Sequence, residues 1–435
     1  MNREAAAKPL GFWACWALVV GCMIGSGVFM LPAVLARYGL LSFGGWLIAG
    51  AGSIALALVF GRLASRTRRS GGPYVYAQQA FGDLAGFMMG WSYWCSFVIG
   101  VPVVAIAFVG YLGVFIPALN GAPVAQALAA LALIWSFTLI NIRGLREMSF
   151  VQILMTVLKI VPLLAIVGLA LAAGSPSNLP ALNPSGQAVG PALAAAALVT
   201  LWAFTGFEVV TLPAGAVREP ERTIPRALIA GMLCVTAIYL SATAAVMLLV
   251  PAAELAQSTA PFADAARAFG PWGAYFIAAG ALVATAGTLN GLVFATGQMP
   301  MAVALDQRAP RQLAATNAGG SPYVALLISS SIASLMLLLN YTRGFIEAFT
   351  FLLMMSTSLS LIYYFVCALA ELRQCWRSAP AWASVALIGC LYSLFAMFGS
   401  GLEVLAWGVV LMAVSVPLFF LFRQLAAPAP VTRPS

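Results

Sequence analysis

The sequence predicts an all-α polytopic membrane protein with twelve transmembrane helices, and its composition and the length of its apolar runs carry that prediction. Of 435 residues, 63% are hydrophobic and 8% are charged, whereas soluble domains are about half apolar and about a quarter charged. Unbroken apolar runs such as 46–60 and 192–204 differ from the alternating segments of about ten residues that build a membrane β-barrel. A water-soluble enzyme and a disordered chain are therefore excluded.

The apolar runs and the Gly, Pro and charged residues that separate them divide the chain into twelve segments. Each is close to or longer than the roughly 20 residues that a helix needs to cross a membrane. Their approximate bounds are 11–36, 41–62, 82–112, 123–141, 149–173, 190–215, 226–250, 271–298, 323–340, 345–370, 381–398 and 402–422. We expect residues 1–435 to form a single domain.

The basic residues predict the orientation of this bundle. With the N-terminus inside, 17 Lys and Arg residues fall on the cytoplasmic side and three, Arg37, Arg267 and Arg343, on the opposite side. Because cytoplasmic loops carry an excess of Lys and Arg, both termini are predicted to be cytoplasmic. The basic residues that give the net charge of +9 then serve to orient the helices in the membrane, and no nucleic-acid partner is expected. Residues 1–36 show no cleavage site before Pro32, so we interpret them as a retained first span.

Two classes of site are disfavoured by residue content. The chain holds no histidine, which removes His-ligated metals and histidine-based catalytic systems. Its seven cysteines are odd in number and lack short spacings, so they indicate neither a disulfide framework nor a zinc site. We expect no catalytic residue, no metal and no cofactor, and we do not expect an enzyme.

Two of the apolar segments are interrupted at equivalent places. Residues 25–27 (Gly-Ser-Gly) break the first span and residues 205–207 (Thr-Gly-Phe) break the sixth, with Pro32 and Pro213 further along. Glycine also serves close helix packing, which is the alternative interpretation of either break alone. Interrupted spans at corresponding positions of two halves are the best sequence indication of a transporter's central site.

Several motifs in order resemble the amino acid–polyamine–organocation superfamily of transporters. They are GCMIGSGVF at 21–29, SGGPYVY at 70–76 with Phe-Gly at 81–82, LWAFTGFE at 201–208 and REPERTIPRA at 218–227. APFADAAR at 260–267 and GSG at 399–401 resemble its bacterial arginine/agmatine antiporter group. The resemblance implies alternating access in a bacterial inner membrane, and a homodimer. It also implies inverted repeats over about 11–173 and 190–370, two further helices over about 381–422 and a short cytoplasmic tail at 423–435.

The broken spans also predict a binding site from elementary chemistry. Free N–H groups where the second half of span 1 begins suit a carboxylate, and carbonyls that end the first halves of both spans suit an ammonium. The candidate substrate-binding residues are Met23, Ile24, Gly25, Ser26, Gly27, Val101, Trp202, Ala203, Phe204, Thr205, Gly206 and Leu292.

The resemblance implies that Trp202 closes over the substrate and that Glu208 is a gating acid, although a carboxyl bonded for structure is the alternative for Glu208. Val101 and Leu292 replace a polar amide and a second tryptophan of the arginine/agmatine group, which hold a guanidinium partly by cation–π contact. We therefore expect a neutral amino acid to be preferred. The alternative is a cationic amino acid/polyamine antiporter.

Lys159 lies near the middle of span 5, where a charge is costly and is a functional hypothesis by default. Residues 157–162 (VLKIVP) resemble the span-5 pattern of sodium-independent transporters, in which the ammonium takes the place of a coupling sodium. Carbonyls near Gly21 and the hydroxyl of Thr285 or Thr288 are its expected partners; the alternative is a lysine that extends to the membrane surface. The predicted function is sodium-independent amino acid transport by exchange or proton coupling, with substrate and membrane lipid as partners. A membrane-embedded enzyme or a sensor is the remote alternative.

Overall fold

The computed structural model describes residues 10–119, 122–258, 261–270, 272–341, 345–399 and 402–426. In these ranges the chain is helical and forms no named strand, apart from an isolated bridge between Leu10 and Val217. Ten helices are long and apolar enough to cross a membrane, and Phe12–Met23 and Tyr323–Leu339 are shorter apolar helices. The chain is thus a polytopic, all-helical membrane protein, as its composition predicts.

Each of the twelve predicted segments contains helix in the described residues: the first forms α1 and α2, the sixth forms α8 followed by 3₁₀ turns, and short helices lie between some of the others. Their bounds are α1 (Phe12–Met23), α2 (Ser26–Ala36), α3 (Leu41–Ser65), α4 (Pro73–Phe81), α5 (Asp83–Phe115), α6 (Pro123–Arg143), α7 (Leu145–Ala173), α8 (Val189–Leu201), α9 (Pro220–Leu249), α10 (Ala252–Leu255), α11 (Pro261–Ala265), α12 (Gly273–Leu305), α13 (Tyr323–Tyr341), α14 (Phe345–Cys375), α15 (Pro380–Gly399) and α16 (Leu402–Ala426).

Several helices are longer than predicted at one end of the molecule, among them α7, α9, α12 and α14. α7 begins at Leu145, α9 begins at Pro220, α12 ends at Leu305 and α14 ends at Cys375. The prediction ended the segments of α7, α9 and α14 next to charged residues, and it ended that of α12 before Pro300, through which the helix continues. A helix can continue past the roughly 30 Å hydrocarbon layer into the polar region, where those charges are solvated.

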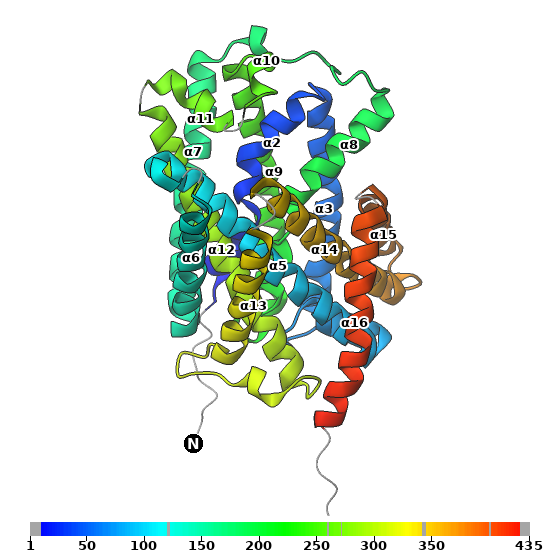
Figure 1. Ribbon diagram of the computed structural model, residues 1–435. Helices are drawn as coiled ribbons and strands as arrows, with labels where there is room; N and C mark the ends of the chain where they lie inside the picture. Colours follow the sequence, from blue (N-terminus) through cyan, green and yellow to red (C-terminus); the bar gives the residue numbers. More distant parts are fainter. Residues whose placement is uncertain are drawn as a thin grey trace, which may run out of the picture.

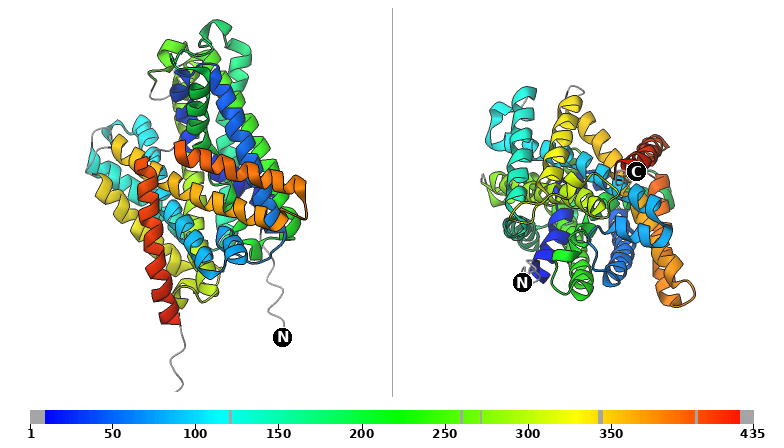
Figure 2. Two further views of the ribbon diagram at one scale, coloured as in Figure 1. Left: turned by 90° about the vertical axis from the view of Figure 1, so that its right-hand side faces the viewer. Right: turned by 90° about the horizontal axis from the view of Figure 1, so that it is seen from below.

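The arrangement places the two interrupted segments inside the bundle. α1 packs against α7, α9 and α12, and α3 packs against α8 and α9. In Figure 1, α2, α10 and α11 lie at the upper end and α5 crosses the bundle obliquely. α16 runs along the outside, as both views of Figure 2 show.

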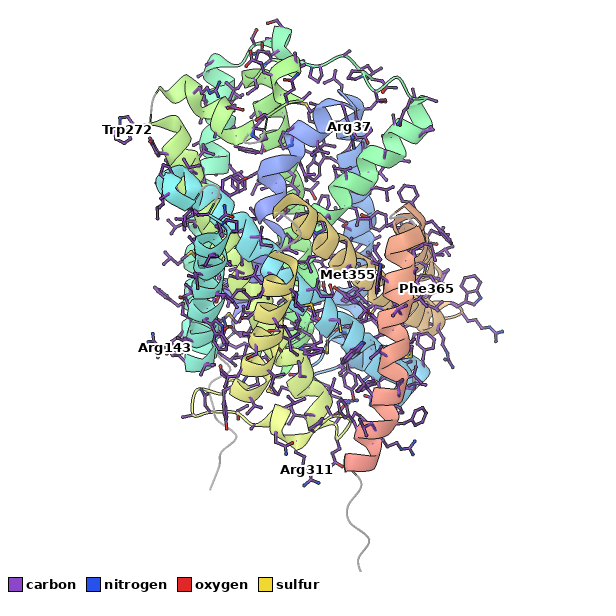
Figure 3. All side chains as sticks on the ribbon, in the orientation of Figure 1. Arg37, Arg143, Trp272, Arg311, Met355 and Phe365 are labelled. Carbon is purple, nitrogen blue, oxygen red and sulfur yellow. The ribbon has the colours of Figure 1, made fainter. Side chains whose placement is uncertain are left out.

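The two ends of the bundle differ in their charged residues. Figure 3 shows Arg37 and Trp272 at the upper end and Arg143 and Arg311 at the lower end. Arg37 thus lies at the opposite end of the molecule from Arg143 and Arg311.

At the lower end, ion pairs join segments far apart in sequence. Arg69 pairs with Asp306, and Arg308 pairs with Asp83. Tyr74 donates a hydrogen bond of 2.8 Å to Asp306. Burial and this hydrogen bond raise the pKa of Tyr74 well above its ordinary value, so the phenol stays neutral and remains a donor. These contacts connect the 66–72 segment and α4 to α5 and the end of α12.

Candidate functional site

The first break separates α1 from α2. Ile24 and Gly25 have extended backbones, with φ/ψ of −75°/92° and −131°/−151°. A Cβ on Gly25 would lie 2.8 Å from the Thr288 hydroxyl oxygen, so only glycine allows α12 to approach the break this closely. The break falls one to two residues before the middle of the predicted 25–27 motif, and it frees backbone carbonyls from their helical partners.

The second break follows α8 and has a different form. Residues Trp202–Phe204 and Phe207–Thr211 are 3₁₀ turns, separated by the extended Thr205 and by Gly206 at φ 97°. That positive φ suits glycine, which has no Cβ to clash. The segment does not resume as an α-helix before α9 begins, although the sequence predicted a simple broken helix. A Cβ on Gly206 would lie 3.2 Å from the Cβ of Cys22, so the two breaks are neighbours.

Lys159 is fully buried where α7 meets the first break. Its Nζ donates to the carbonyl oxygens of Gly21 and Ile24, each at 2.7 Å, and to the Thr288 hydroxyl at 3.3 Å. An ammonium has three N–H donors, so each of them has an acceptor. Thr285 bonds the carbonyl of Ala281 in its own helix instead. The structure therefore places Lys159 against the broken helix and away from the membrane surface.

Glu208 is a fully buried acid at the start of the 3₁₀ turn that follows the second break. Tyr363 and Tyr364 each donate a 2.6 Å hydrogen bond, one to each carboxyl oxygen. Tyr364 in turn accepts a 3.3 Å hydrogen bond from the Gly206 N–H. Both carboxyl oxygens of Glu208 thus accept a hydrogen bond, and the two tyrosines connect Glu208 to the break through α14.

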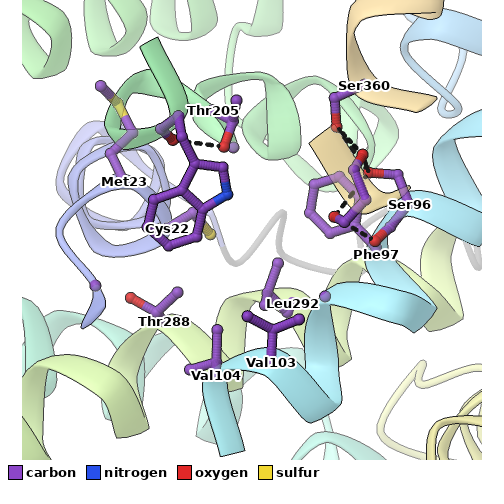
Figure 4. A pocket seen from close by; sticks show the side chains of 15 residues that line it. Cys22, Met23, Ser96, Phe97, Val103, Val104, Thr205, Thr288, Leu292 and Ser360 are labelled. Atoms are coloured by element: carbon purple, nitrogen blue, oxygen red, sulfur yellow. Dashed lines mark hydrogen bonds between the residues drawn. The ribbon is translucent and has the colours of Figure 1, made fainter. Parts of the chain in front are cut away.

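A central cavity lies beside the two breaks (Figure 4). Cys22, Met23 and Thr205 lie on one side of it and Ser96, Phe97 and Ser360 on the other, with Thr288, Leu292, Val103 and Val104 between them. The full set of lining residues is Cys22, Met23, Gly25, Ser96, Phe97, Gly100, Val103, Val104, Trp202, Thr205, Gly206, Thr288, Leu292, Ser356 and Ser360. No lining residue in the described part of the chain is acidic.

Three serines form a hydroxyl cluster on the α5–α14 side of the cavity. The Ser96 hydroxyl lies 2.7 Å from that of Ser360 and donates to the Ser356 carbonyl at 2.8 Å. The Ser356 hydroxyl donates to the Ser96 carbonyl at 2.9 Å. Their oxygen lone pairs are the principal side-chain acceptors on this side.

The structure brings six of the predicted substrate residues to the cavity, namely Met23, Gly25, Trp202, Thr205, Gly206 and Leu292. Others lie beside it. Ile24 turns its carbonyl to Lys159, and Gly27 lies against the Trp202 ring, where a Cβ would be 2.1 Å away. Phe204 packs against the ring of Trp46. The side chain of Ser26 lies outside the described part of the structure.

Val101 is buried but is not among the cavity-lining residues. Gly100, Val103 and Val104 line the cavity in its place. Successive residues of a helix are about 100° apart, so a shift of one residue in the expected register puts a different side chain at the cavity. Of the two residues that predicted a neutral substrate, Val101 and Leu292, only Leu292 lines the cavity.

Tyr239 of α9 is a site residue that the sequence analysis missed. Its hydroxyl lies 2.8 Å from the carbonyl oxygen of Met23 and 2.9 Å from that of Ala203, one in each interrupted segment. A hydroxyl has one proton, so Tyr239 can donate to only one of these carbonyls at a time, and it lies where it connects the two interrupted segments. A tyrosine inside an apolar run gives no sequence signal for such a role.

The comparisons with known proteins agree on one family. The family model described as amino acid permease matches residues 10–428. The chain is 30% identical to the cadaverine/lysine antiporter of Escherichia coli (strain K12), with 96% of this chain and 95% of that protein covered. It is 29% identical to the putrescine transporter PotE of the same strain over 94% of each chain. The PotE protein of Haemophilus influenzae is 29% identical, with 96% and 97% covered.

Proposed function

The chain belongs to the amino acid permease family, within the amino acid–polyamine–organocation superfamily, and on that premise we propose that it exchanges cationic amino acids and polyamines across the inner membrane. The observation that carries the proposal is the cavity at two adjacent broken helices, in a chain that aligns nearly end to end with polyamine and lysine antiporters. The protein acts as a secondary transporter by alternating access and catalyses no chemical conversion of its substrate.

The substrate class that we propose is an alkyl ammonium. An ammonium is a point charge that needs only a few acceptors, whereas a guanidinium needs a planar fork of them. The carbonyl ends of the breaks can take one ammonium, and the serine cluster can take a second at the far side of the cavity. The rings of Trp202 and Phe97, which both line the cavity, favour a cation between these ends. Lysine, cadaverine and putrescine fit this pattern better than arginine or agmatine.

The comparisons thus favour the cationic alternative over the neutral preference that Val101 and Leu292 predicted. A neutral amino acid remains the second candidate because of one specific observation. Leu292, Val103 and Val104 give the cavity an apolar side, and no described lining residue supplies a negative charge.

A transport panel distinguishes the two candidates. Proteoliposomes take up labelled lysine in the presence of competing lysine, cadaverine, putrescine, arginine, leucine or alanine. We expect the first three to compete at least about tenfold more strongly than the neutral amino acids, a difference of about 1.4 kcal/mol. Trp202→Ala should impair uptake of every accepted substrate, because its ring lines the cavity. Competition by neutral amino acids alone would reverse the assignment.

We further propose that all twelve segments cross the membrane, as two five-helix inverted repeats followed by α15 and α16, with both termini cytoplasmic. The two breaks in equivalent segments and the excess of arginine at the lower end support this. The homodimer that the family resemblance implies stays a prediction.

The orientation can be tested with two single cysteines. Thr316 and Gln187 are exposed and lie in the connections before α13 and before α8. A membrane-impermeant maleimide applied to intact cells should label Gln187→Cys, whereas Thr316→Cys should react only after the cells are permeabilised. The unsubstituted protein is the control for its own cysteines. The opposite labelling pattern would show that the basic end faces outward.

A further inference from the structure

A groove on the outside of the bundle lies apart from the central cavity. It is formed by α3, α9 and α15 near the end where Arg143 and Arg311 lie. Its lining residues are Ala57, Leu58, Gly61, Arg62, Ser65, Arg66, Glu221, Pro225, Ile229 and Trp382. We call it the α3–α9–α15 groove. None of these residues takes part in the proposed substrate site.

The groove changes character along its length. Arg62 and Arg66 occupy the last turn and the end of α3, whereas Ala57 and Leu58 lie one to two turns deeper. Ile229 on α9 adds an apolar wall and is 38% exposed. Trp382 lies at the beginning of α15, at the level where tryptophan is enriched in membrane proteins. The groove therefore has a basic rim at the membrane surface and an apolar interior.

The charges at the rim are not balanced. Arg62 Nε lies 2.9 Å from one oxygen of Glu371, and Arg66 Nη1 lies 2.6 Å from the other. Two arginines thus share one buried carboxylate. The other acid at the groove, Glu221, pairs with Arg68. Three arginines face two glutamates, so the rim keeps a net positive charge.

The Arg62 guanidinium is also positioned to take a phosphate. It lies over the Trp382 ring, 4.4 Å from the ring centre. Stacking engages the flat face of a guanidinium and leaves its N–H groups pointing outward in the plane, which is the geometry that binds phosphate oxygens in pairs. Arg62 uses Nε for Glu371, and the described residues provide no recorded hydrogen bond to its two terminal nitrogens.

We propose that the α3–α9–α15 groove binds an anionic phospholipid of the cytoplasmic leaflet. The phosphate lies at Arg62 and Arg66, and an acyl chain follows the groove past Gly61 between Leu58 and Ile229. Basic pockets between helices at the cytoplasmic surface attract anionic head groups, and the apolar interior adds a contact that a soluble anion cannot make. Because the rim is positively charged, we expect the groove to select a lipid with a negatively charged head group.

The test is lipid retention by the intact purified protein. The protein is extracted from vesicles of equal phosphatidylglycerol and phosphatidylcholine, and bound lipids are counted by native mass spectrometry. We expect phosphatidylglycerol to be retained in excess. Arg62→Gln leaves Glu371 paired with Arg66 and should lower that excess about fivefold. Trp382→Leu keeps every ion pair and should lower it too, so one variant remains informative if the other fails to fold.

The matched control is Arg423→Gln, which removes an exposed arginine from α16, a helix that contributes no residue to the groove. It should leave retention unchanged. Equal retention of the two lipids by the unsubstituted protein would overturn the proposal, and so would an equal loss in Arg423→Gln, which would indicate a diffuse surface charge. Displacement of the lipid by inorganic phosphate would reduce the site to an anion site. A change from dimer to monomer in the Trp382→Leu mass, with no change in lipid, would assign the groove to a second copy of the chain.

Discussion

Replacing Lys159 with alanine is expected to reduce exchange about tenfold to hundredfold at every pH between about 5 and 8, and the unsubstituted protein is expected to need no sodium. The ammonium satisfies the carbonyls of Gly21 and Ile24 at 2.7 Å each, where α1 is interrupted. A buried acceptor that loses its donor costs about 1–3 kcal/mol. Without Lys159, the break loses the group that ties it to α7, so it no longer holds the geometry of the adjacent cavity.

Two threonines of α12 provide matched controls for Lys159. Thr288 contacts Lys159, and its hydroxyl lies 3.0 Å from the carbonyl oxygens of both Gly21 and Ile24, so it can donate to either of them. Thr288→Val should therefore give an intermediate loss. Within the described residues, the Thr285 hydroxyl contacts carbonyls of its own helix, so Thr285→Val should transport almost normally. Initial exchange rates in proteoliposomes measure all three variants. A sodium requirement in the unsubstituted protein would contradict the role of Lys159 as a fixed substitute for a sodium ion.

Replacing Glu208 with glutamine is expected to flatten the pH dependence of exchange. Glu208 is the acid beside the second break, and both of its oxygens accept tyrosine hydroxyls at 2.6 Å. Protonation would turn one of these oxygens into a donor and weaken it as an acceptor of its tyrosine hydroxyl. Because Tyr364 also accepts from the Gly206 N–H, such a change would be transmitted to the break. Glutamine keeps the shape of the side chain but cannot ionise.

The pH profile separates this role from a structural one. Initial rates between about pH 5 and 8 cover the range in which a perturbed buried carboxyl changes its charge. The matched variant is Tyr363→Phe, which removes one hydrogen bond to Glu208 and retains the carboxyl. It should lower the rate and keep the pH dependence. An unchanged profile in Glu208→Gln would move the titrating group elsewhere or show that no proton is coupled.

The elements of the site that follow from local sequence were predictable. The Gly25 and Gly206 breaks were visible as interruptions of apolar runs, because glycine serves close approach at one and positive φ at the other. Lys159 was visible because a single charge inside a span has few explanations. Its partner Thr288 was one of two candidates one helical turn apart, and the structure selects the one that faces α1.

The elements that depend on the rotation of one long helix against another were not predictable. Val101 was chosen where its neighbours line the cavity, because an apolar run on all faces gives no periodic signal to fix the register. For the same reason the tyrosines at 363 and 364 could not be matched to Glu208, which lies about 155 residues earlier. The charged helix ends were mistaken for loops because hydropathy records the hydrocarbon layer and not the full helix.

If one cavity binds lysine and the polyamine in turn, transport must occur as obligatory exchange. Sodium-free proteoliposomes loaded with labelled lysine are diluted into buffer alone or into buffer with cadaverine, with no pH difference across the membrane. We expect label to leave at least about tenfold faster when cadaverine is outside, and we expect Trp202→Ala and Lys159→Ala to lose this stimulation. Efflux of labelled lysine at the same rate with and without external amine would contradict obligatory exchange.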